Sequence, residues 1–213
     1  MPMQNDNPVR ILVWSDYVCP FCYLERPVLE RIKADLGETI EIDWRSFELR
    51  PEPEPTLDPN AEYLHRVWKQ SVYPMAEERG LDLMKLPPVQ PRSRKAHEAA
   101  EYAREVGLLD AMNHSLFKAF FEEGRDLADV EVLIDIGRSV GLDEDGLRQA
   151  LDSGRYAERV LEDEQLARQV GISGVPALIV TAGAQAYLVS GAQPYETVMS
   201  VIAQARGAAD AAS

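Results

Sequence analysis

The chain has 213 residues, 46% of them hydrophobic, and a formal net charge of −14. This length and composition fit one soluble globular domain, or one core that carries an inserted subdomain. The strong negative charge disfavours nucleic acids and anionic membranes as partners. The N-terminus lacks the basic start and apolar run of a secretory leader, and no segment is apolar enough to span a membrane, so we expect a cytoplasmic protein.

The first part of the chain predicts a strand, a helix and a second strand. The apolar run Arg10–Ser15 is typical of a buried strand, and it leads through a turn into a helix that Gly37 ends. Pro27 lies inside this helix and predicts a kink. Hydrophobic residues alternate with polar ones over residues 40–44, which predicts the second strand. The proline-rich residues 50–59 then indicate a boundary.

The middle of the chain shows only helical patterns, which favours an α/β core interrupted by an all-helical insertion. We interpret the apolar stripe Leu116–Phe121 as packing rather than as a binding face. Two short strands at 177–181 and 186–190 predict a hairpin, and residues 194–206 a last helix, with residues 1–8 and 207–213 as unstructured ends. The candidate helices of the insertion are 61–79, 93–106, 109–123, 129–140, 143–152 and 155–170.

The chain has two cysteines, Cys19 and Cys22, placed where the first strand gives way to a helix. Residues three apart at a helix start share a face, so the two sulfurs can approach bonding distance. The free N–H groups and the dipole of the helix start stabilise a thiolate at Cys19, while Cys22 is more shielded. Pro20 fits the first helical turn, where its missing N–H costs nothing.

Two other interpretations of the cysteine pair remain open. The pair could be two ordinary buried thiols, or half of a zinc site. Zinc needs two further ligands, and His65, His97 and His114 do not show the spacing of a zinc finger. A redox-active pair is therefore the favoured interpretation, without a bound metal.

A second element is the segment Gly171–Ala177, in which Val175 precedes Pro176 at a predicted strand start. A flanking glycine and a β-branched residue before the proline are compatible with a cis Val175–Pro176 bond. Cis bonds before proline are uncommon in folded proteins, at about 5–6%, so this segment alone does not establish one.

The cysteine pair after the first strand, the late Gly-Val-Pro and the helical insertion together resemble the DsbA-like thioredoxin-fold proteins. Several stretches are similar to the cytoplasmic FrnE-like branch of that group, and the resemblance extends from about Val9 to Arg206. The stretches are Ser15–Tyr23, Phe120–Asp126, Gly171–Pro176 and Ser190–Pro194.

The resemblance implies a thioredoxin-like fold with a large helical insertion between the second and third core strands. Residues 9–58 and 171–206 would form the discontinuous thioredoxin-like domain, and residues 60–170 the inserted helical subdomain. It also implies Cys19 as nucleophile, Cys22 as resolving thiol, and Val175 with a cis Pro176 as the platform for an extended substrate. Pro20 and Phe21 would support the motif.

The function expected from this resemblance is thiol–disulfide exchange on protein or small-molecule disulfides. No cofactor is expected beyond the Cys19–Cys22 pair, with glutathione as a possible co-substrate, and the sequence does not set the oligomeric state. One alternative is a glutathione-dependent isomerase or transferase of the 2-hydroxychromene-2-carboxylate or kappa type, in which serine usually replaces the residue matching Cys19. Another is a non-enzymatic redox sensor or holdase-like module.

Two acidic residues flank the cysteine pair in sequence, and a histidine lies on a predicted helix of the insertion. We expect Asp16 and Glu25 to be solvated carboxylates and His97 to be structural rather than to face the thiols. Because Pro20 and Phe21 carry no charge or side-chain donor, we also expect the pair to be less oxidising than periplasmic DsbA.

Overall fold

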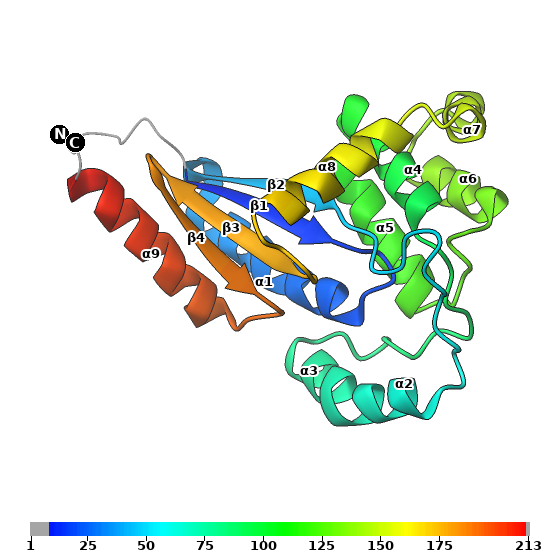
Figure 1. Cartoon of the computed structure of the whole chain (residues 1–213), viewed down its shortest axis with the longest axis horizontal. Helices are drawn as coiled ribbons and strands as arrows, with labels where there is room; N and C mark the ends of the chain where they lie inside the picture. The colour runs from blue at the N-terminus through cyan, green and yellow to red at the C-terminus, as the bar shows by residue number, and fades with distance from the viewer. Residues whose placement is uncertain (1–8, 212–213) are drawn as a thin grey trace.

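A computed structural model describes residues 9–211 of the chain (Figure 1). Its first four elements are β1 (Val9–Ser15), α1 (Pro20–Leu36), the short 3-10 helix η1 (Gly37–Thr39) and β2 (Ile40–Ser46). The helical region that follows contains α2 (Glu62–Val67), the π-helical turn η2 (Trp68–Val72), α3 (Tyr73–Glu78), α4 (Arg94–Glu105), α5 (Leu109–Phe121), α6 (Val130–Ser139), α7 (Glu144–Ser153) and α8 (Ala157–Gln169). The chain then forms β3 (Ala177–Ala182), β4 (Gln185–Ser190) and α9 (Tyr195–Ala211).

The four strands form one sheet in the order β2-β1-β3-β4. β1 runs parallel to β2 and antiparallel to β3, and β3 pairs with β4 as a hairpin. Ile11 in the centre of β1 lies opposite Ile42 of β2 and Val180 of β3. This mixed sheet with helices confirms the predicted α/β class.

Different helices cover the two faces of the sheet. Successive side chains of β1 point to opposite faces, so neighbouring residues of this strand pack against different elements. Ile11 and Val13 belong to a core that includes residues of α1 and α9, such as Ile32 and Ile202. Trp14 packs instead in a cluster with Ala167 of α8, on the other face. Helices therefore lie on both sides of the sheet, as Figure 1 shows for α8 in front and α1 behind, although Leu188 of β4 is 51% exposed.

The rest of the helical region stands to one side of the sheet (Figure 1). Phe117, Phe120 and Phe121 of α5 have exposed fractions of 0%, 0% and 1%, so the predicted apolar stripe is core packing. Helices α2 and α3 form a separate lobe below α5 in this view, and the Trp68 and Phe121 rings lie 6.0 Å apart. The division into two domains remains a prediction. Helix α8 belongs to the predicted insertion by sequence, but it packs on the sheet through Ala167.

Most predicted elements agree with the structure within two or three residues, with two exceptions. The predicted helix 61–79 is divided by η2, directly before Pro74 near the start of α3. Proline lacks the N–H that would continue the helical ladder, which fits a wider turn at this point. The prediction of an unstructured end from residue 207 is wrong for residues 207–211, which continue α9, whereas residues 1–8 lie outside the described part.

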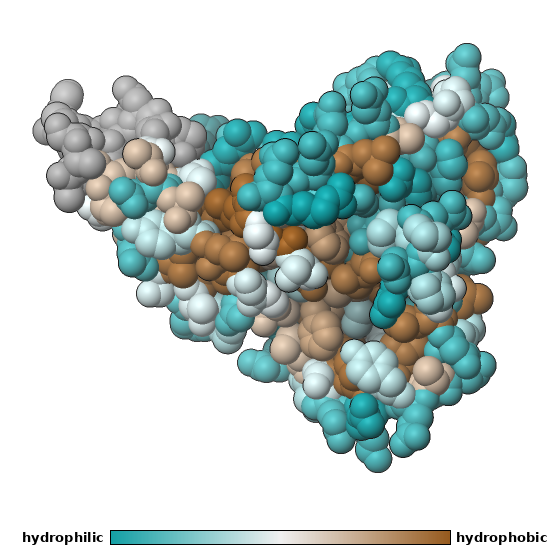
Figure 2. All heavy atoms as spheres, viewed as in Figure 1, coloured by the Kyte–Doolittle hydropathy of each residue, from teal (hydrophilic) through white to brown (hydrophobic). Residues whose placement is uncertain are grey.

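The surface of the face shown in Figure 2 is mostly hydrophilic, with hydrophobic residues gathered over the sheet and in the hollow beside the α2–α3 lobe. None of the helices in the described part of the chain has the length and apolar character needed to cross a membrane.

Candidate active site

Cys19 and Cys22 lie at the junction of β1 and α1. Cys19 is the N-cap residue of α1, with an extended backbone, and Pro20 is the first helical residue. The Cys19 N–H donates to the Asp16 carbonyl at 3.1 Å, which closes the turn from the strand into the helix. Both cysteines are free thiols. The local sequence thus places Cys19 at the positive end of the helix dipole.

The two thiols differ in their surroundings. Cys22 is completely buried, and Cys19 is 3% exposed. Burial, followed by a hydrogen bond and charge repulsion from Cys19, raises the pKa of the Cys22 thiol well above its ordinary value. The Asp16 N–H, 3.5 Å from the Cys22 sulfur, opposes this shift. Cys22 therefore keeps its proton at neutral pH.

The segment before β3 lies against Cys19. The Val175–Pro176 peptide bond is cis, and the Cys19 thiol lies 3.5 Å from the Val175 carbonyl oxygen, to which it donates. The Gly191 N–H donates to the Pro176 carbonyl at 2.8 Å and ties this segment to the end of β4. The fold thus brings all four residues of the expected catalytic and substrate-binding set to one place.

A cavity of about 310 Å³ opens beside Cys19. Its wall combines the active-site turn and Val175 with the α2–α3 lobe and the loops on either side of it. Pro20 and Phe21, expected as supporting residues, line it together with Trp68 and Phe121, and Arg50 contributes a charged group. The cavity falls in the size range of small-molecule sites and is predominantly apolar. Sequence patterns could not identify it because its walls come from distant segments.

The expectation that Asp16 is solvated is wrong, since its side chain is 0% exposed. Its Oδ1 accepts from the Val18 N–H at 3.3 Å and its Oδ2 from the Leu49 N–H at 2.7 Å. A buried carboxylate needs such donors, and these two connect the active-site turn to the loop after β2. Asp16 therefore fixes the shape of the turn that carries both cysteines.

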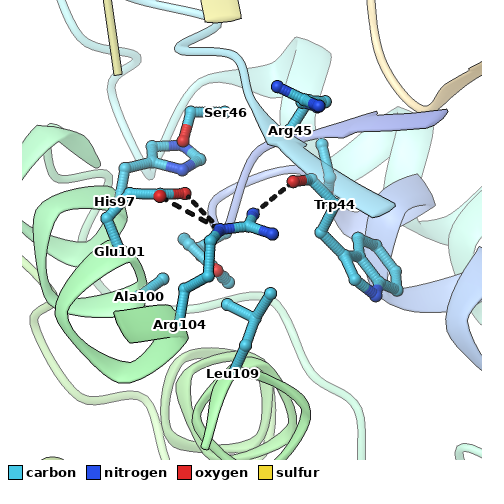
Figure 3. A pocket seen from close by; sticks show the side chains of 10 residues that line it. Trp44, Arg45, Ser46, His97, Ala100, Glu101, Arg104 and Leu109 are labelled. Carbon is cyan, nitrogen blue, oxygen red and sulfur yellow. Dashed lines mark hydrogen bonds and ion pairs between the residues drawn. The ribbon is translucent and has the colours of Figure 1, made fainter. Parts of the chain in front are cut away.

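His97 of α4 packs against this turn, at Asp16 and Tyr17. Its Nε2 is 3.5 Å from the Asp16 Oδ1, and its ring contacts Tyr17 at a centroid distance of 4.8 Å. Nε2 makes no hydrogen bond to the described residues. Figure 3 shows His97 beside Glu101 and Arg104 around a small pocket of about 10 Å³, large enough for about one water molecule.

Glu25 is also buried, at 1% exposure, so the expectation of a solvated carboxylate is wrong here as well. Burial raises its pKa to about 7, against the opposing effects of Arg79 and of the Gln193 N–H. The Glu25 Oε2 lies 3.1 Å from Arg79 Nη1 and 2.9 Å from the Gln193 nitrogen. Arg79 also donates to the carbonyls of Leu24 and Gln193, at 2.6 and 2.9 Å. This cluster joins α1, the end of α3 and the loop before α9.

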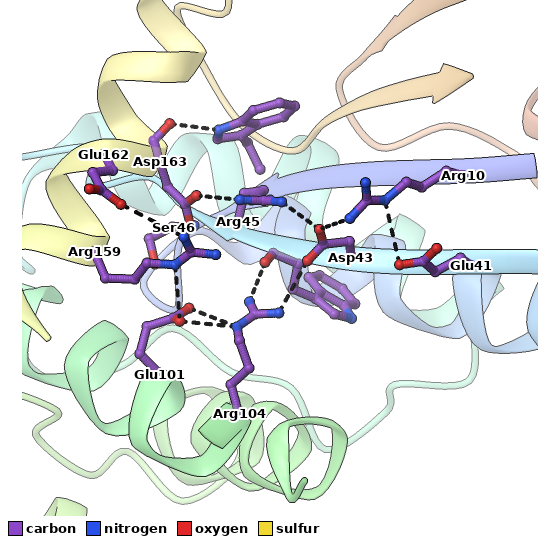
Figure 4. Close-up of polar contacts among 12 residues, drawn as sticks. Arg10, Glu41, Asp43, Arg45, Ser46, Glu101, Arg104, Arg159, Glu162 and Asp163 are labelled. Carbon is purple, nitrogen blue, oxygen red and sulfur yellow. Dashed lines mark hydrogen bonds and ion pairs between the residues drawn. The ribbon is translucent and has the colours of Figure 1, made fainter. Parts of the chain in front are cut away.

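A second polar network fixes the helical region on β2 (Figure 4). Asp163 of α8 is 2% exposed, and its carboxylate accepts from Arg45 and from the Ser46 N–H at 2.9 and 3.0 Å. The Asp163 carbonyl accepts from the Trp14 indole at 2.9 Å. On the other side Arg104 of α4 lies 3.1 Å from Asp43. No local pattern in the sequence distinguishes these charged residues from surface ones.

The described residues contain no group of three or more His, Cys, Asp or Glu side chains placed to hold a metal ion. The chemistry that the arrangement itself offers is that of a paired thiol: an N-cap sulfur beside a substrate-sized cavity, with a second, protonated sulfur behind it.

Comparison with known proteins places this fold and site in a family. The chain belongs to the DSBA-like thioredoxin domain family, whose pattern matches residues 10–203. It is 35% identical over 176 residues to the uncharacterized protein YwbO of Bacillus subtilis (strain 168). This alignment covers 81% of this chain and 86% of that protein.

Solved structures extend the comparison. The probable DsbA oxidoreductase SCO1869 from Streptomyces coelicolor superposes with a TM-score of 0.80 at 27% identity, covering 93% of this chain and 90% of that one. A 2-hydroxychromene-2-carboxylate isomerase superposes with a TM-score of 0.72 at 20% identity, and the match covers 96% of this chain and 100% of that one. The cytosolic disulfide reductase DsbM from Pseudomonas aeruginosa, in a structure with GSH, superposes with a TM-score of 0.66 at 18% identity, and the match covers 92% of this chain and 99% of that one. The last two, at these identities, show the fold alone.

Proposed function

We propose that this protein is a cytoplasmic thiol–disulfide oxidoreductase in which Cys19 is the nucleophile and Cys22 the resolving thiol. The observation that carries the proposal is the position of the Cys19 sulfur, 3.5 Å from the Val175 carbonyl and at the edge of the cavity, with Cys22 buried behind it. Membership of the DSBA-like family supports the reaction class. Placement in the FrnE-like branch is part of the proposal.

The reaction proceeds in two exchange steps. The Cys19 thiolate attacks one sulfur of a substrate disulfide, the substrate S–S bond breaks, and the departing thiolate takes up a proton. Cys22 then loses its proton and attacks the Cys19 sulfur, which releases the second substrate thiol and leaves the Cys19–Cys22 disulfide. The substrate is reduced by two electrons and the enzyme is oxidised by two.

A thiol reductant must then restore the pair, and glutathione is the co-substrate we propose. Two glutathione molecules would reduce the Cys19–Cys22 disulfide and leave as one glutathione disulfide. The related fold of DsbM, solved with GSH, supports a test of this step. In the opposite direction the same steps would oxidise a dithiol substrate.

Val175 and Pro176 form the proposed substrate platform. The carbonyl of Val175 already faces the Cys19 sulfur, so an extended peptide lying along this segment would bring its own sulfur to Cys19. The apolar cavity beside it would receive the neighbouring part of the substrate.

The test is to trap mixed disulfides with the Cys22→Ser variant. The variant should accumulate substrate covalently attached to Cys19, whereas Cys19→Ser and the double variant should trap none. Insulin-disulfide reduction with glutathione as donor should be lost in Cys19→Ser. Retention of that activity in Cys19→Ser would refute the assignment.

The isomerase alternative makes a different prediction in the same set of variants. A glutathione-dependent isomerase of chromene carboxylates would turn over its substrate with glutathione bound and would not need Cys22. Isomerisation by the wild type and by Cys22→Ser, without disulfide exchange, would therefore establish that alternative. A redox sensor would oxidise once and show no turnover in either assay.

A further inference from the structure

Asp16 contacts both cysteines through its main chain. Its carbonyl accepts from the Cys19 N–H at 3.1 Å, and its own N–H donates to the Cys22 sulfur at 3.5 Å. Both groups belong to the turn between β1 and α1, so their orientation depends on the shape of that turn. The Asp16 side chain fixes this shape, which makes the carboxylate relevant to the chemistry of both thiols.

The two N–H groups that hold the carboxylate belong to the walls of the cavity at Cys19. Oδ1 accepts from Val18 at 3.3 Å, Oδ2 accepts from Leu49 at 2.7 Å, and both donor residues line the cavity. The first bond closes a short turn that a neutral Asn or Ser could also close. The second bond reaches 33 residues along the chain, and a charged acceptor makes it stronger. The charge therefore serves the link to the loop after β2.

Burial makes this carboxylate costly to keep. Asp16 is 0% exposed, and the Nε2 of His97, at 3.5 Å from Oδ1, is too far away for a strong bond. Removing a carboxylate from water is unfavourable unless donors compensate it, whereas a neutral side chain would close the same turn at a lower cost. A charged residue here is explained if the orientation of the Asp16 N–H matters to the reaction.

The second exchange step places negative charge on Cys22. This sulfur is completely buried, so solvent does not stabilise the thiolate, and a donor aimed at it has a larger effect than in water. The Asp16 N–H already faces the sulfur in the reduced protein, so it needs no rearrangement when the charge develops.

We propose that Asp16 is a positioning residue for the second exchange step. Its carboxylate, bound to the N–H groups of Val18 and Leu49, orients the Asp16 N–H toward the Cys22 sulfur while this sulfur attacks the mixed disulfide. The inference rests on the proposed function, in which Cys22 resolves a mixed disulfide at Cys19. It predicts that changes at Asp16 slow the second step and spare the first.

The test separates the two steps with an aromatic disulfide, 5,5′-dithiobis(2-nitrobenzoate). Attack by the Cys19 thiolate breaks the S–S bond of the reagent, releases one nitrothiobenzoate anion and leaves the other half bound to Cys19. Cys22 then loses its proton to the buffer and attacks the Cys19 sulfur, which releases the second anion and forms the Cys19–Cys22 disulfide. The first release is second order and the second is first order, so stopped-flow absorbance measures each rate constant by itself.

Two variants test the side chain. Asp16→Asn and Asp16→Ser each keep an oxygen acceptor for the turn and remove the charge that strengthens the bond to Leu49. We expect each to slow the first-order release by about tenfold or more and to change the second-order rate constant by less than about threefold. The reverse step, in which dithiothreitol attacks Cys19 of the oxidised pair and Cys22 departs as a thiolate, should be slowed as well.

Two further variants serve as controls. Glu48→Gln is the matched one, because Glu48 precedes Leu49 in the same loop, is 5% exposed and pairs with Arg94 at 2.5 Å. It disturbs that loop without changing Asp16, and both rate constants should stay near their wild-type values. Cys22→Ser should release one anion only, which assigns the second phase to Cys22. Circular dichroism verifies the fold of each variant.

Three outcomes would overturn this inference alone. Equal first-order rates in the wild type and in both Asp16 variants would remove the positioning role. A faster release in the variants would mean that the carboxylate repels the Cys22 thiolate more than the N–H stabilises it. Equal slowing of both phases would show a purely structural role. If the wild type released no second anion, the oxidoreductase proposal itself would fail, and this inference would fail with it.

Discussion

The sulfur of Cys19 and the carbonyl oxygen of Val175 lie 3.5 Å apart, although 156 residues separate them in the chain. The contact joins the start of α1 to the segment that enters β3, and the whole helical region lies between them in sequence. It therefore forms only when the two halves of the core have assembled.

Limiting alkylation of the reduced protein near pH 7 should label Cys19 before Cys22. Cys19 is at the helix start beside the cavity, whereas Cys22 is completely buried and has a raised pKa. The thiolate is the reactive form, so both factors favour Cys19. Peptide mapping by mass spectrometry gives the ratio, with the denatured protein as the control in which both label. Preferential labelling of Cys22 would contradict the assignment of roles.

The redox potential of the pair should lie between those of thioredoxin and DsbA, nearer thioredoxin. Pro20 and Phe21 offer no charge to the thiolate, and the nearby Arg26 pairs with Glu30 at 2.6 Å. Less stabilisation of the reduced form means a lower potential. Equilibration with glutathione redox buffers measures it. A value at or above about −120 mV, that of DsbA, would be incompatible with this reasoning.

Glu25 should make the protein less stable as the pH rises from about 4.5 to above 7. Its pKa is raised from 4.5 to about 7 in the folded state. Its contribution to the free energy of unfolding is therefore fully present below about pH 4.5 and is lost as the pH rises through about 7, where the buried side chain becomes charged. The difference corresponds to about 3 kcal/mol between the two limits. Urea unfolding at several pH values should show a smaller pH slope for Glu25→Gln. The exposed Glu38→Gln serves as control and should keep the wild-type slope.

Asp163→Asn should lower the free energy of unfolding by about 1–3 kcal/mol, because the amide cannot accept from both Arg45 and the Ser46 N–H, while Arg45 keeps its pair with Asp43 at 2.6 Å. Glu162→Gln, on the same helix and 60% exposed, should cost about 1 kcal/mol or less. Denaturant unfolding of both variants provides the comparison. Similar losses in the two would mean that the network in Figure 4 does not anchor α8 to β2.

The sequence by itself determined the order of elements and the place of the cysteine pair. Apolar periodicity and glycine stops are local signals, so the strand Val9–Ser15, the helix after Cys19 and most helices of the insertion could be predicted within a few residues. The resemblance added Val175 and Pro176, whose approach to Cys19 no local pattern encodes.

Only the tertiary structure decided which charged side chains are buried. Asp16, Glu25 and Asp163 look like surface acids in the sequence, since burial depends on donors that distant segments supply: Leu49, Arg79 and Arg45. The same holds for the cavity at Cys19, whose walls are formed by elements far apart in the chain. Residue type and spacing specify local conformation, whereas burial and ligand-sized space arise from packing between elements, which a single sequence does not display.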